Sequence, residues 1–168
     1  MMLRLRFSAA VGAVVLGVGV PPTYTRAQSP TAVAPPTAAA IARAPDQYAT
    51  LGDVRLRYRE IGRGEAVVML HGMARSLEDW IGLGDSLARD HRVIAVDQRG
   101  FGKSSRFSDS RRFGVELAED VVRLLDHLDI ERAHLVGHSM GARVAAAVAA
   151  RHPDRVESVT LVAGPFFE

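Results

Sequence analysis

Apolar residues alternate with arginines between residues 54 and 60, where Arg55, Arg57 and Arg59 separate Val54, Leu56 and Tyr58. This period of two predicts a strand with one face in water, the face that carries the arginines. The turn-forming sequence at 51–53 comes just before it. Residues 47–60 are therefore predicted to form a β-hairpin.

Later apolar runs are almost continuous, which favours strands that are covered on both faces of a parallel sheet. They are residues 66–70, 93–96, 135–136 and 159–163. Helical patterns lie between them. The strongest has the spacing i, i+4, i+7, i+8, i+11 and comprises Leu117, Val121, Leu124, Leu125 and Leu128.

Two further helices are predicted around that pattern. An Ala-rich stretch runs from about Met140 to Arg151 and ends before Pro153. A weaker segment begins at a Ser76 cap, carries Trp80, Leu83 and Leu87, and is interrupted by glycines. This alternation of strand and helix predicts an α/β fold, with a mostly parallel sheet, right-handed crossovers, helices on both faces and the N-terminal β-hairpin.

The N-terminal third lacks these patterns and predicts a domain organisation of three parts. Residues 1–27 combine a basic start, an apolar run and small residues before Ala27, as in a cleaved signal peptide. Residues 28–45 are rich in Ala, Pro and Thr and predict an extended linker. The folded domain is predicted to span 46–168, in a secreted or periplasmic protein without a stable membrane span after cleavage.

Composition narrows the function classes. The chain has no cysteine, which excludes disulfides, thiolate metal sites and a cysteine nucleophile. Its formal net charge is +2, but without the predicted signal peptide 18 Lys and Arg face 19 Asp and Glu. No basic field is left to attract nucleic acid or an anionic membrane.

A serine flanked by glycines lies between the run at 135–136 and the Ala-rich helix. Gly137-His138-Ser139-Met140-Gly141 matches Gly-x-Ser-x-Gly in the strand–turn–helix setting of a nucleophile elbow. The turn is so sharp that its flanking residues crowd one another, which glycine permits. Negative charge is favoured at the helix N-terminus, and the Met140 N–H can face a developing oxyanion. An ordinary tight turn around a serine is the alternative interpretation.

Two more loops follow predicted strands at the same edge of the sheet. In His71-Gly72-Met73, a bend at Gly72 can turn the Met73 N–H toward the same pocket, and we expect His71 to shape the loop rather than move protons. Residues 97–105 predict a compact turn held by an internal Asp97–Arg99 network. The spacing of a phosphate-binding P-loop is absent from it.

Together, residues 71–73, 97–104 and 137–141 resemble the α/β-hydrolase family in order and approximate spacing, over about residues 47–168. The resemblance implies that Ser139 is the nucleophile and that the Met73 and Met140 N–H groups form the oxyanion hole. The chain looks more like the carboxylesterase, lactonase and carbon–carbon-bond hydrolase branches of the family. The dehalogenase and epoxide-hydrolase branches use aspartate where this chain has Ser139. The resemblance implies acyl transfer from a small-molecule, ester-like substrate to water, without cofactor or metal.

That family places an Asp or Glu and then a His after the serine. The residues available there are Asp154, Glu157, Glu168 and His152. Asp154 and Glu157 precede a strand and belong to the opposite edge of the sheet, and His152 closes the far end of the Ala-rich helix. His91, His127 and His134 also belong elsewhere, and the His138 side chain should diverge from the serine.

We therefore predict no general base or acid in this chain. We expect it to be the amino-terminal portion of a hydrolase and inactive alone. The strand at 158–163 would then be an unpaired apolar edge through which chains self-associate.

Two alternatives from other classes stay open. A non-catalytic binding or interaction protein would retain the fold without the missing partners. A dinucleotide-binding protein would use Gly137 and Gly141 at a helix start and Glu157 on the ribose, but it lacks the middle glycine of G-x-G-x-x-G.

Overall fold

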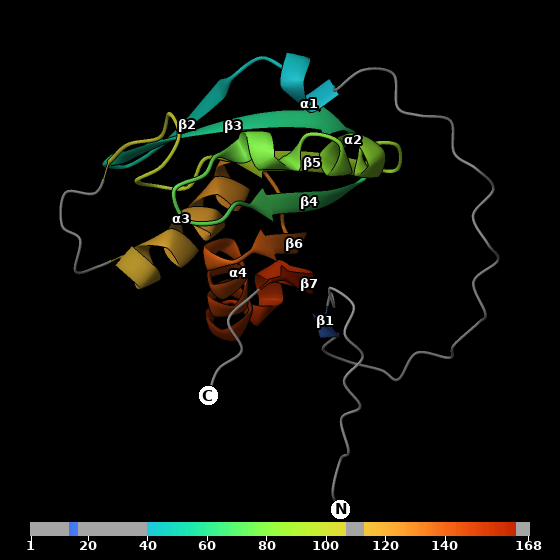
Figure 1. The fold of residues 1–168 in the computed structure, drawn as a ribbon. Coiled ribbons are helices and arrows are strands. Elements are labelled where there is room, and N and C mark those ends of the chain that lie inside the picture. Colours follow the sequence, from blue (N-terminus) through green and yellow to red (C-terminus); the bar gives the residue numbers. More distant parts are fainter. Residues whose placement is uncertain (1–13, 17–39, 107–112, 164–168) are drawn as a thin grey trace, which may run out of the picture.

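A computed structural model describes residues 14–16, 40–106 and 113–163 (Figure 1). They contain one seven-stranded sheet with the order β1-β7-β6-β4-β5-β3-β2. The strands are β1 (Val14–Leu16), β2 (Gln47–Leu51), β3 (Val54–Gly62), β4 (Glu65–Leu70), β5 (His91–Val96), β6 (Ala133–His138) and β7 (Val156–Val162). The helices are α1 (Ala40–Arg43), η1 (Leu77–Trp80), α2 (Leu83–Leu87), α3 (Phe113–His127), α4 (Met140–Arg151) and η3 (Pro153–Arg155).

The middle of the sheet is parallel, as the continuous apolar runs predicted. β4 pairs in parallel with β5 and β6, and β6 pairs in parallel with β7. The predicted hairpin is β2–β3, whose second strand joins β5 antiparallel. The predicted fold class, an α/β fold with a mostly parallel sheet and an N-terminal hairpin, is confirmed.

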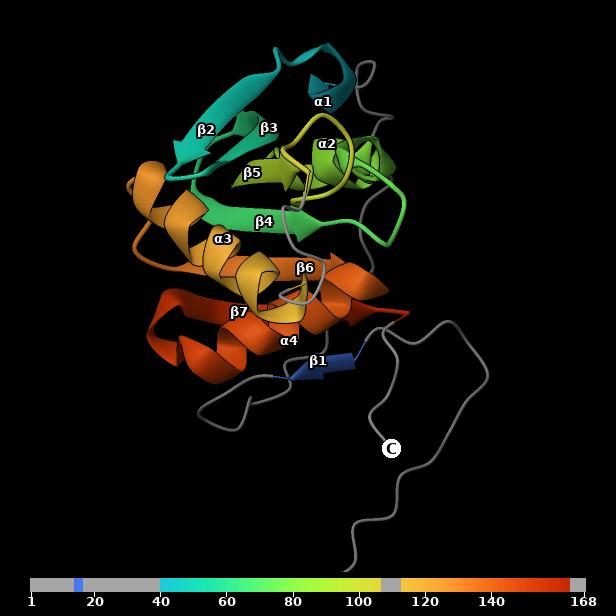
Figure 2. The ribbon, with the colours of Figure 1, turned by 90° about the vertical axis from the view of Figure 1, so that its left-hand side faces the viewer.

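Helices cover both faces of this sheet. Successive residues of β4 serve opposite faces, because side chains alternate along a strand. Val68 and Leu70 pack in the cluster that contains the apolar residues of α3 and α4, whereas Val67 and Met69 pack with those of α1 and η1. Figure 2 shows α3 and α4 together on one side of the sheet.

The weak helix predicted after Ser76 is two short elements instead of one. Gly82 between them has φ +90°, in the left-handed region that interrupts a helix. Ser76 precedes η1 without donating or accepting a capping hydrogen bond through its side chain. The Leu77 N–H is bound by Asp97 Oδ1, at 2.7 Å, so that the cap comes from the end of β5.

We expected the folded unit to start at Asp46, but it begins earlier in the chain. Ile41 of α1 is completely buried, and its Cδ1 occupies the space that a Cβ on Gly84 would need, 2.3 Å away. The Ile41 N–H donates to the buried Asp85 carboxylate at 2.8 Å, and Arg59 donates to the Ile41 carbonyl. Residues 40–45, assigned above to the linker, thus include an anchor of the domain.

The outer edge of β7 is paired in the full chain, by a strand from the predicted signal peptide; removal of residues 1–27 would leave it unpaired, as we expected. β1 pairs with it antiparallel over three residues, with Val14 opposite Leu161 and Leu16 opposite Val159. The backbone of an added strand pairs with the free N–H and C=O groups of such an edge. Among the helices of the described ranges, none is both long and apolar enough to cross a bilayer.

We predict that Ile41→Ala lowers the free energy of unfolding by about 2–5 kcal/mol, because it leaves a cavity against Gly84. Urea unfolding followed by the fluorescence of Trp80, the single tryptophan, measures this. Arg43→Ala is the matched control, since Arg43 is exposed on the same helix. Equal stabilities of the two variants would show that α1 does not anchor the domain.

Candidate active site

Ser139 lies at a sharp turn between β6 and α4, as the elbow motif predicts. Its φ is +50°, a conformation that L-residues rarely adopt. The two glycines are required by backbone contacts: a Cβ on Gly137 would lie 2.3 Å from the Gly141 carbonyl oxygen, and one on Gly141 would lie 2.0 Å from the Leu70 carbonyl oxygen. The Ser139 N–H donates to the Val162 carbonyl of β7 at 2.9 Å, so three strands hold the turn.

The loop after β4 lies directly against this turn. A Cβ on Gly72 would be 3.5 Å from the Ser139 Cβ and 3.0 Å from His138 Nδ1. The residue with a left-handed backbone is Ala74, at φ +59°, and not Gly72, where we expected the bend. Gly72 therefore lies in van der Waals contact with the turn, and a Cβ there would require only a small shift of the His138 ring.

The predicted oxyanion donors are Met73 N–H and Met140 N–H. Met140 is the first residue of α4, where backbone amides have no partner within the helix. Within the described part of the chain, neither amide donates a hydrogen bond to protein. Met73 is 61% exposed and Ser139 is partly exposed, so this edge is open to a ligand. Two free amides beside a serine suit a developing negative charge.

His71 is completely buried and takes no part in proton transfer to Ser139. Its Nδ1 lies 2.7 Å from the Gly72 carbonyl oxygen, and its Nε2 accepts the Gln98 N–H at 3.0 Å. Because a carbonyl only accepts, the proton must be on Nδ1 and the ring is neutral. Burial lowers the pKa of His71 below its ordinary value and favours the same state.

The buried carboxylate of Asp97, directly after β5, binds several elements near the site. It accepts hydrogen bonds from the Leu77 N–H at 2.7 Å, from the Lys103 N–H at 2.8 Å and from Arg57 at 3.0 Å. Gly102, at φ +51°, leaves room for it, since a Cβ there would lie 2.1 Å from Asp97 Oδ2. One side chain therefore fixes β3, η1 and the turn after β5 together.

Arg57 corrects our prediction that all three arginines of β3 face water. It is 2% exposed and forms ion pairs with Asp46, Glu78 and Asp97 at 2.7, 2.7 and 3.0 Å. A buried cation must be paired, and the three carboxylates supply that pairing. The sequence carried no local signal for it, because the partners lie in three separate segments.

The predicted Asp97–Arg99 network does not form. Arg99 makes two hydrogen bonds of 2.7 Å to Asp120 in α3, and both side chains are buried. Asp97 turns instead to Arg57. Each charge of the turn thus binds a different element, which fastens the turn to both faces of the sheet.

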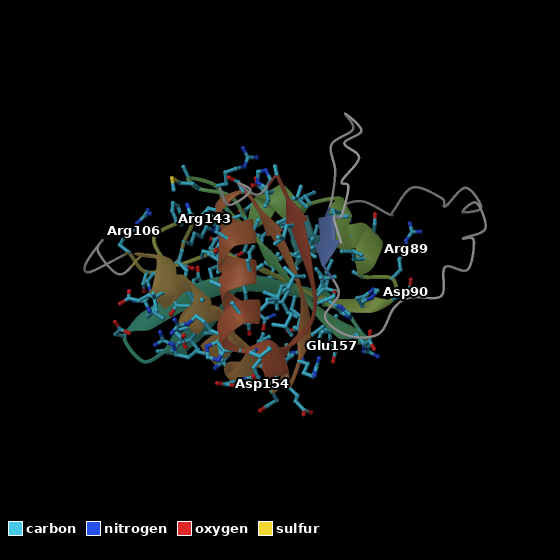
Figure 3. All side chains as sticks on the ribbon, turned by 90° about the horizontal axis from the view of Figure 1, so that it is seen from below. Arg89, Asp90, Arg106, Arg143, Asp154 and Glu157 are labelled. Atoms are coloured by element: carbon cyan, nitrogen blue, oxygen red, sulfur yellow. The ribbon has the colours of Figure 1, made fainter. Side chains whose placement is uncertain are left out.

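Asp154, Glu157 and His152, which follow Ser139 in the sequence, lie away from it, and Glu168 is outside the described residues. In Figure 3 Asp154 and Glu157 are at the end of the molecule opposite Arg143, which belongs to the first turns of α4. His152 binds Glu119 at 3.1 Å. In the described ranges no hydrogen bond joins Ser139 to His138 or to any other histidine, and no three metal-ligating side chains gather.

Comparison with known proteins agrees with this geometry. The sequence pattern of the alpha/beta hydrolase fold matches residues 65–168. The chain belongs to the α/β-hydrolase family. Within the family it is 43% identical over 119 residues to the dihydrolipoyllysine-residue acetyltransferase component of the acetoin cleaving system of Pseudomonas putida, covering 70% of this chain and 32% of that protein.

Two other relatives show the spread of this family. Epoxide hydrolase B of Mycobacterium tuberculosis is 42% identical over 106 residues, which cover 62% of this chain and 30% of that protein. The crystal structure of a membrane phospholipase A, a bacterial virulence factor, superimposes with a TM-score of 0.71 at 29% identity, covering 76% of this chain and 42% of that one. The α/β-hydrolase chain described here thus spans less than half the length of these relatives.

We predict that the strain at the elbow is measurable as stability. Ser139→Gly should have a free energy of unfolding about 1–3 kcal/mol higher than Ser139→Ala, and so a higher urea midpoint, since only glycine adopts φ +50° without cost. Both variants lack the hydroxyl, so each controls for the other. Equal unfolding midpoints would contradict a strained turn.

We predict that acid weakens the domain through Glu78. Burial raises the pKa of Glu78, but its hydrogen bonds to Arg57, to Ser76 and to the backbone, together with the Arg57 charge, outweigh burial and hold the pKa at about 2 instead of 4.5. Because the folded-state pKa is the lower one, stability is complete above about pH 4.5 and is lost as pH falls toward 2. Urea unfolding between pH 6 and pH 2.5 measures this loss.

Glu78→Gln should flatten that pH dependence. Glu131→Gln is the control, because Glu131 is exposed and its side chain has no ion pair in the described part of the chain. A Glu78→Gln profile as steep as that of the control would refute the assignment.

Proposed function

We propose that this chain is a serine hydrolase of ester-type carbonyl compounds that acts through an acyl-enzyme on Ser139. The observation that carries the proposal is the strained φ of Ser139 beside two amides without protein acceptors, Met73 N–H and Met140 N–H. Strain of this kind persists only where the surrounding structure enforces it. The close backbone contacts that Gly137 and Gly141 permit, and the Ser139 N–H bond to the Val162 carbonyl, hold the turn in this conformation.

In this mechanism Ser139 Oγ attacks the carbonyl carbon and the carbonyl electrons move to its oxygen. The two amides bind that oxygen while it is negative, and removing one such donor typically costs about 10²–10³ in rate. Collapse of the intermediate breaks the bond to the alkoxy oxygen, which takes up the proton lost by Ser139 and leaves as the alcohol, and the acyl group stays on Ser139. Water then attacks the acyl-enzyme and releases the acid.

Names among the relatives support the class without fixing the substrate. One is a hydrolase of epoxides, one a phospholipase and one an acetyltransferase component, so the family carries several chemistries. We assign ester-type carbonyl substrates because position 139 is serine. We also propose that the protein is secreted or periplasmic, on the basic and apolar sequence of residues 1–27.

The hydroxyl proton of Ser139 needs an acceptor, and the described residues bring no imidazole within hydrogen-bonding distance of it. Loss of the histidine from a Ser-His-Asp triad on another fold costs about 10⁶ in turnover, while the oxyanion hole and binding retain about 10³–10⁴ over water. The described part of the chain therefore provides nucleophile and oxyanion hole, with residual reactivity. A binding protein that retains the fold is the second candidate, favoured by the same observation.

We predict that a fluorophosphonate labels the full chain slowly and selectively at Ser139, because two oriented amides stabilise the phosphonyl oxygen as they would an oxyanion. Intact mass and peptide mapping after long incubation locate the adduct. Ser139→Ala should abolish labelling, and Ser86→Ala, which removes an exposed serine, should leave it unchanged. A chain that stays unlabelled under these conditions would overturn Ser139 as a competent nucleophile in this chain and favour the binding protein.

A further inference from the structure

Two successive peptide groups of the loop after β4 are each held by a buried hydrogen bond on the carbonyl side. The Gln98 Nε2 donates to the His71 carbonyl at 2.7 Å. The His71 Nδ1–H donates to the Gly72 carbonyl, also at 2.7 Å. Gln98 is 3% exposed and follows β5, so it reaches across the sheet edge to the end of β4.

These bonds also fix the directions of the next two amides. A trans peptide group is planar, and its C=O and N–H point in opposite directions. The bond to the His71 carbonyl therefore directs the Gly72 N–H away from Gln98. The bond to the Gly72 carbonyl directs the Met73 N–H away from the buried His71 ring. The loop lies beside Ser139, since a Cβ on Gly72 would be 3.5 Å from the Ser139 Cβ.

The other half of the Gln98 side chain is poorly accommodated. Its Oε1 is buried and has no hydrogen-bond partner among the described residues. Reversing the amide would place that oxygen against the His71 carbonyl oxygen, so the orientation with Nε2 as donor is the only favourable one. Buried acceptors without partners are rare because they destabilise the fold. Leucine would fill similar space without this penalty, which points to a use for the Nε2–H donor.

We propose that Gln98 is a positioning residue for the oxyanion hole. Its side chain holds the His71–Gly72 peptide and its backbone N–H holds His71 in the Nδ1–H tautomer, and together they aim the Met73 N–H at the oxygen that develops on the substrate. The proposal rests on the proposed function, since it needs an acyl or phosphonyl group on Ser139. Gln98 does not itself touch that group.

The first test is the rate of fluorophosphonate labelling of the full chain. Gln98→Leu should slow labelling of Ser139 at least about tenfold, within the 10²–10³ that loss of a whole oxyanion donor costs. Gln47→Leu is the matched control. It also removes a side-chain hydrogen bond, from the Tyr58 hydroxyl at 3.2 Å, but on β2. It should label at the wild-type rate.

The second test separates a changed direction of the Met73 N–H from a general disturbance of the fold. In the phosphonyl adduct of the wild type, the amide protons of Met73 and Met140 should both shift downfield in the NMR spectrum, because both bind the phosphonyl oxygen. In the adduct of Gln98→Leu, only Met140 should keep its shift. Met140 thus reports that the elbow is intact while Met73 reports its own direction.

A third variant serves if Gln98→Leu does not fold. In Gln98→Glu the carboxyl group donates to the His71 carbonyl only when it is protonated. Its labelling rate, divided by that of the wild type at the same pH, should therefore rise as the pH falls. A ratio that is constant with pH would overturn the proposal.

The outcomes distinguish this inference from the proposed function. An unlabelled wild type removes the proposed function and the inference with it. A labelled wild type together with Gln98→Leu that labels at the same rate, with both amide shifts present, overturns the inference alone. Slowed labelling with loss of the Met73 shift and retention of the Met140 shift supports both.

Discussion

Direct contact between backbones at the elbow is the constraint on which the site depends. Gly141 meets the Leu70 carbonyl and Gly137 meets the Gly141 carbonyl at distances that leave no room for a Cβ. These contacts bring the ends of β4 and β6 and the start of α4 together without intervening side chains. Ser139 is left at the surface of that junction, with the loop after β4 beside it.

Buried charges keep the neighbouring loops in register with this junction. Asp97 joins η1, β3 and the turn after β5, and Arg99 joins the same turn to α3 through Asp120. Removing one member of such a pair leaves an uncompensated buried charge, which is strongly destabilising. The loops around Ser139 are thus held by bonds that cannot be broken singly at low cost, and this gives the amides their fixed directions.

Some features of the site oppose stability, and they gather at one edge of the sheet. Ser139 and Ala74 have left-handed backbones without being glycine, and Gln98 leaves an acceptor unsatisfied in the interior. Local departures from stable geometry are expected where a protein positions reactive groups. Ser139, Ala74 and Gln98 thus lie at the carboxyl edge of the sheet, whereas Asp154 lies at the opposite, amino edge.

The sequence by itself determined the parallel strands, the span of α4 and the place of Ser139 at the turn between β6 and α4, because hydrophobic period, glycine spacing and the strand–turn–helix order are properties of short windows. It misplaced Arg57, treated Ile41 as linker and paired Asp97 with Arg99. Only the tertiary structure decided these points. The partner of a buried charge, and the cavity that accepts an anchoring side chain, depend on which distant segments meet when the sheet assembles, and no local pattern records that meeting.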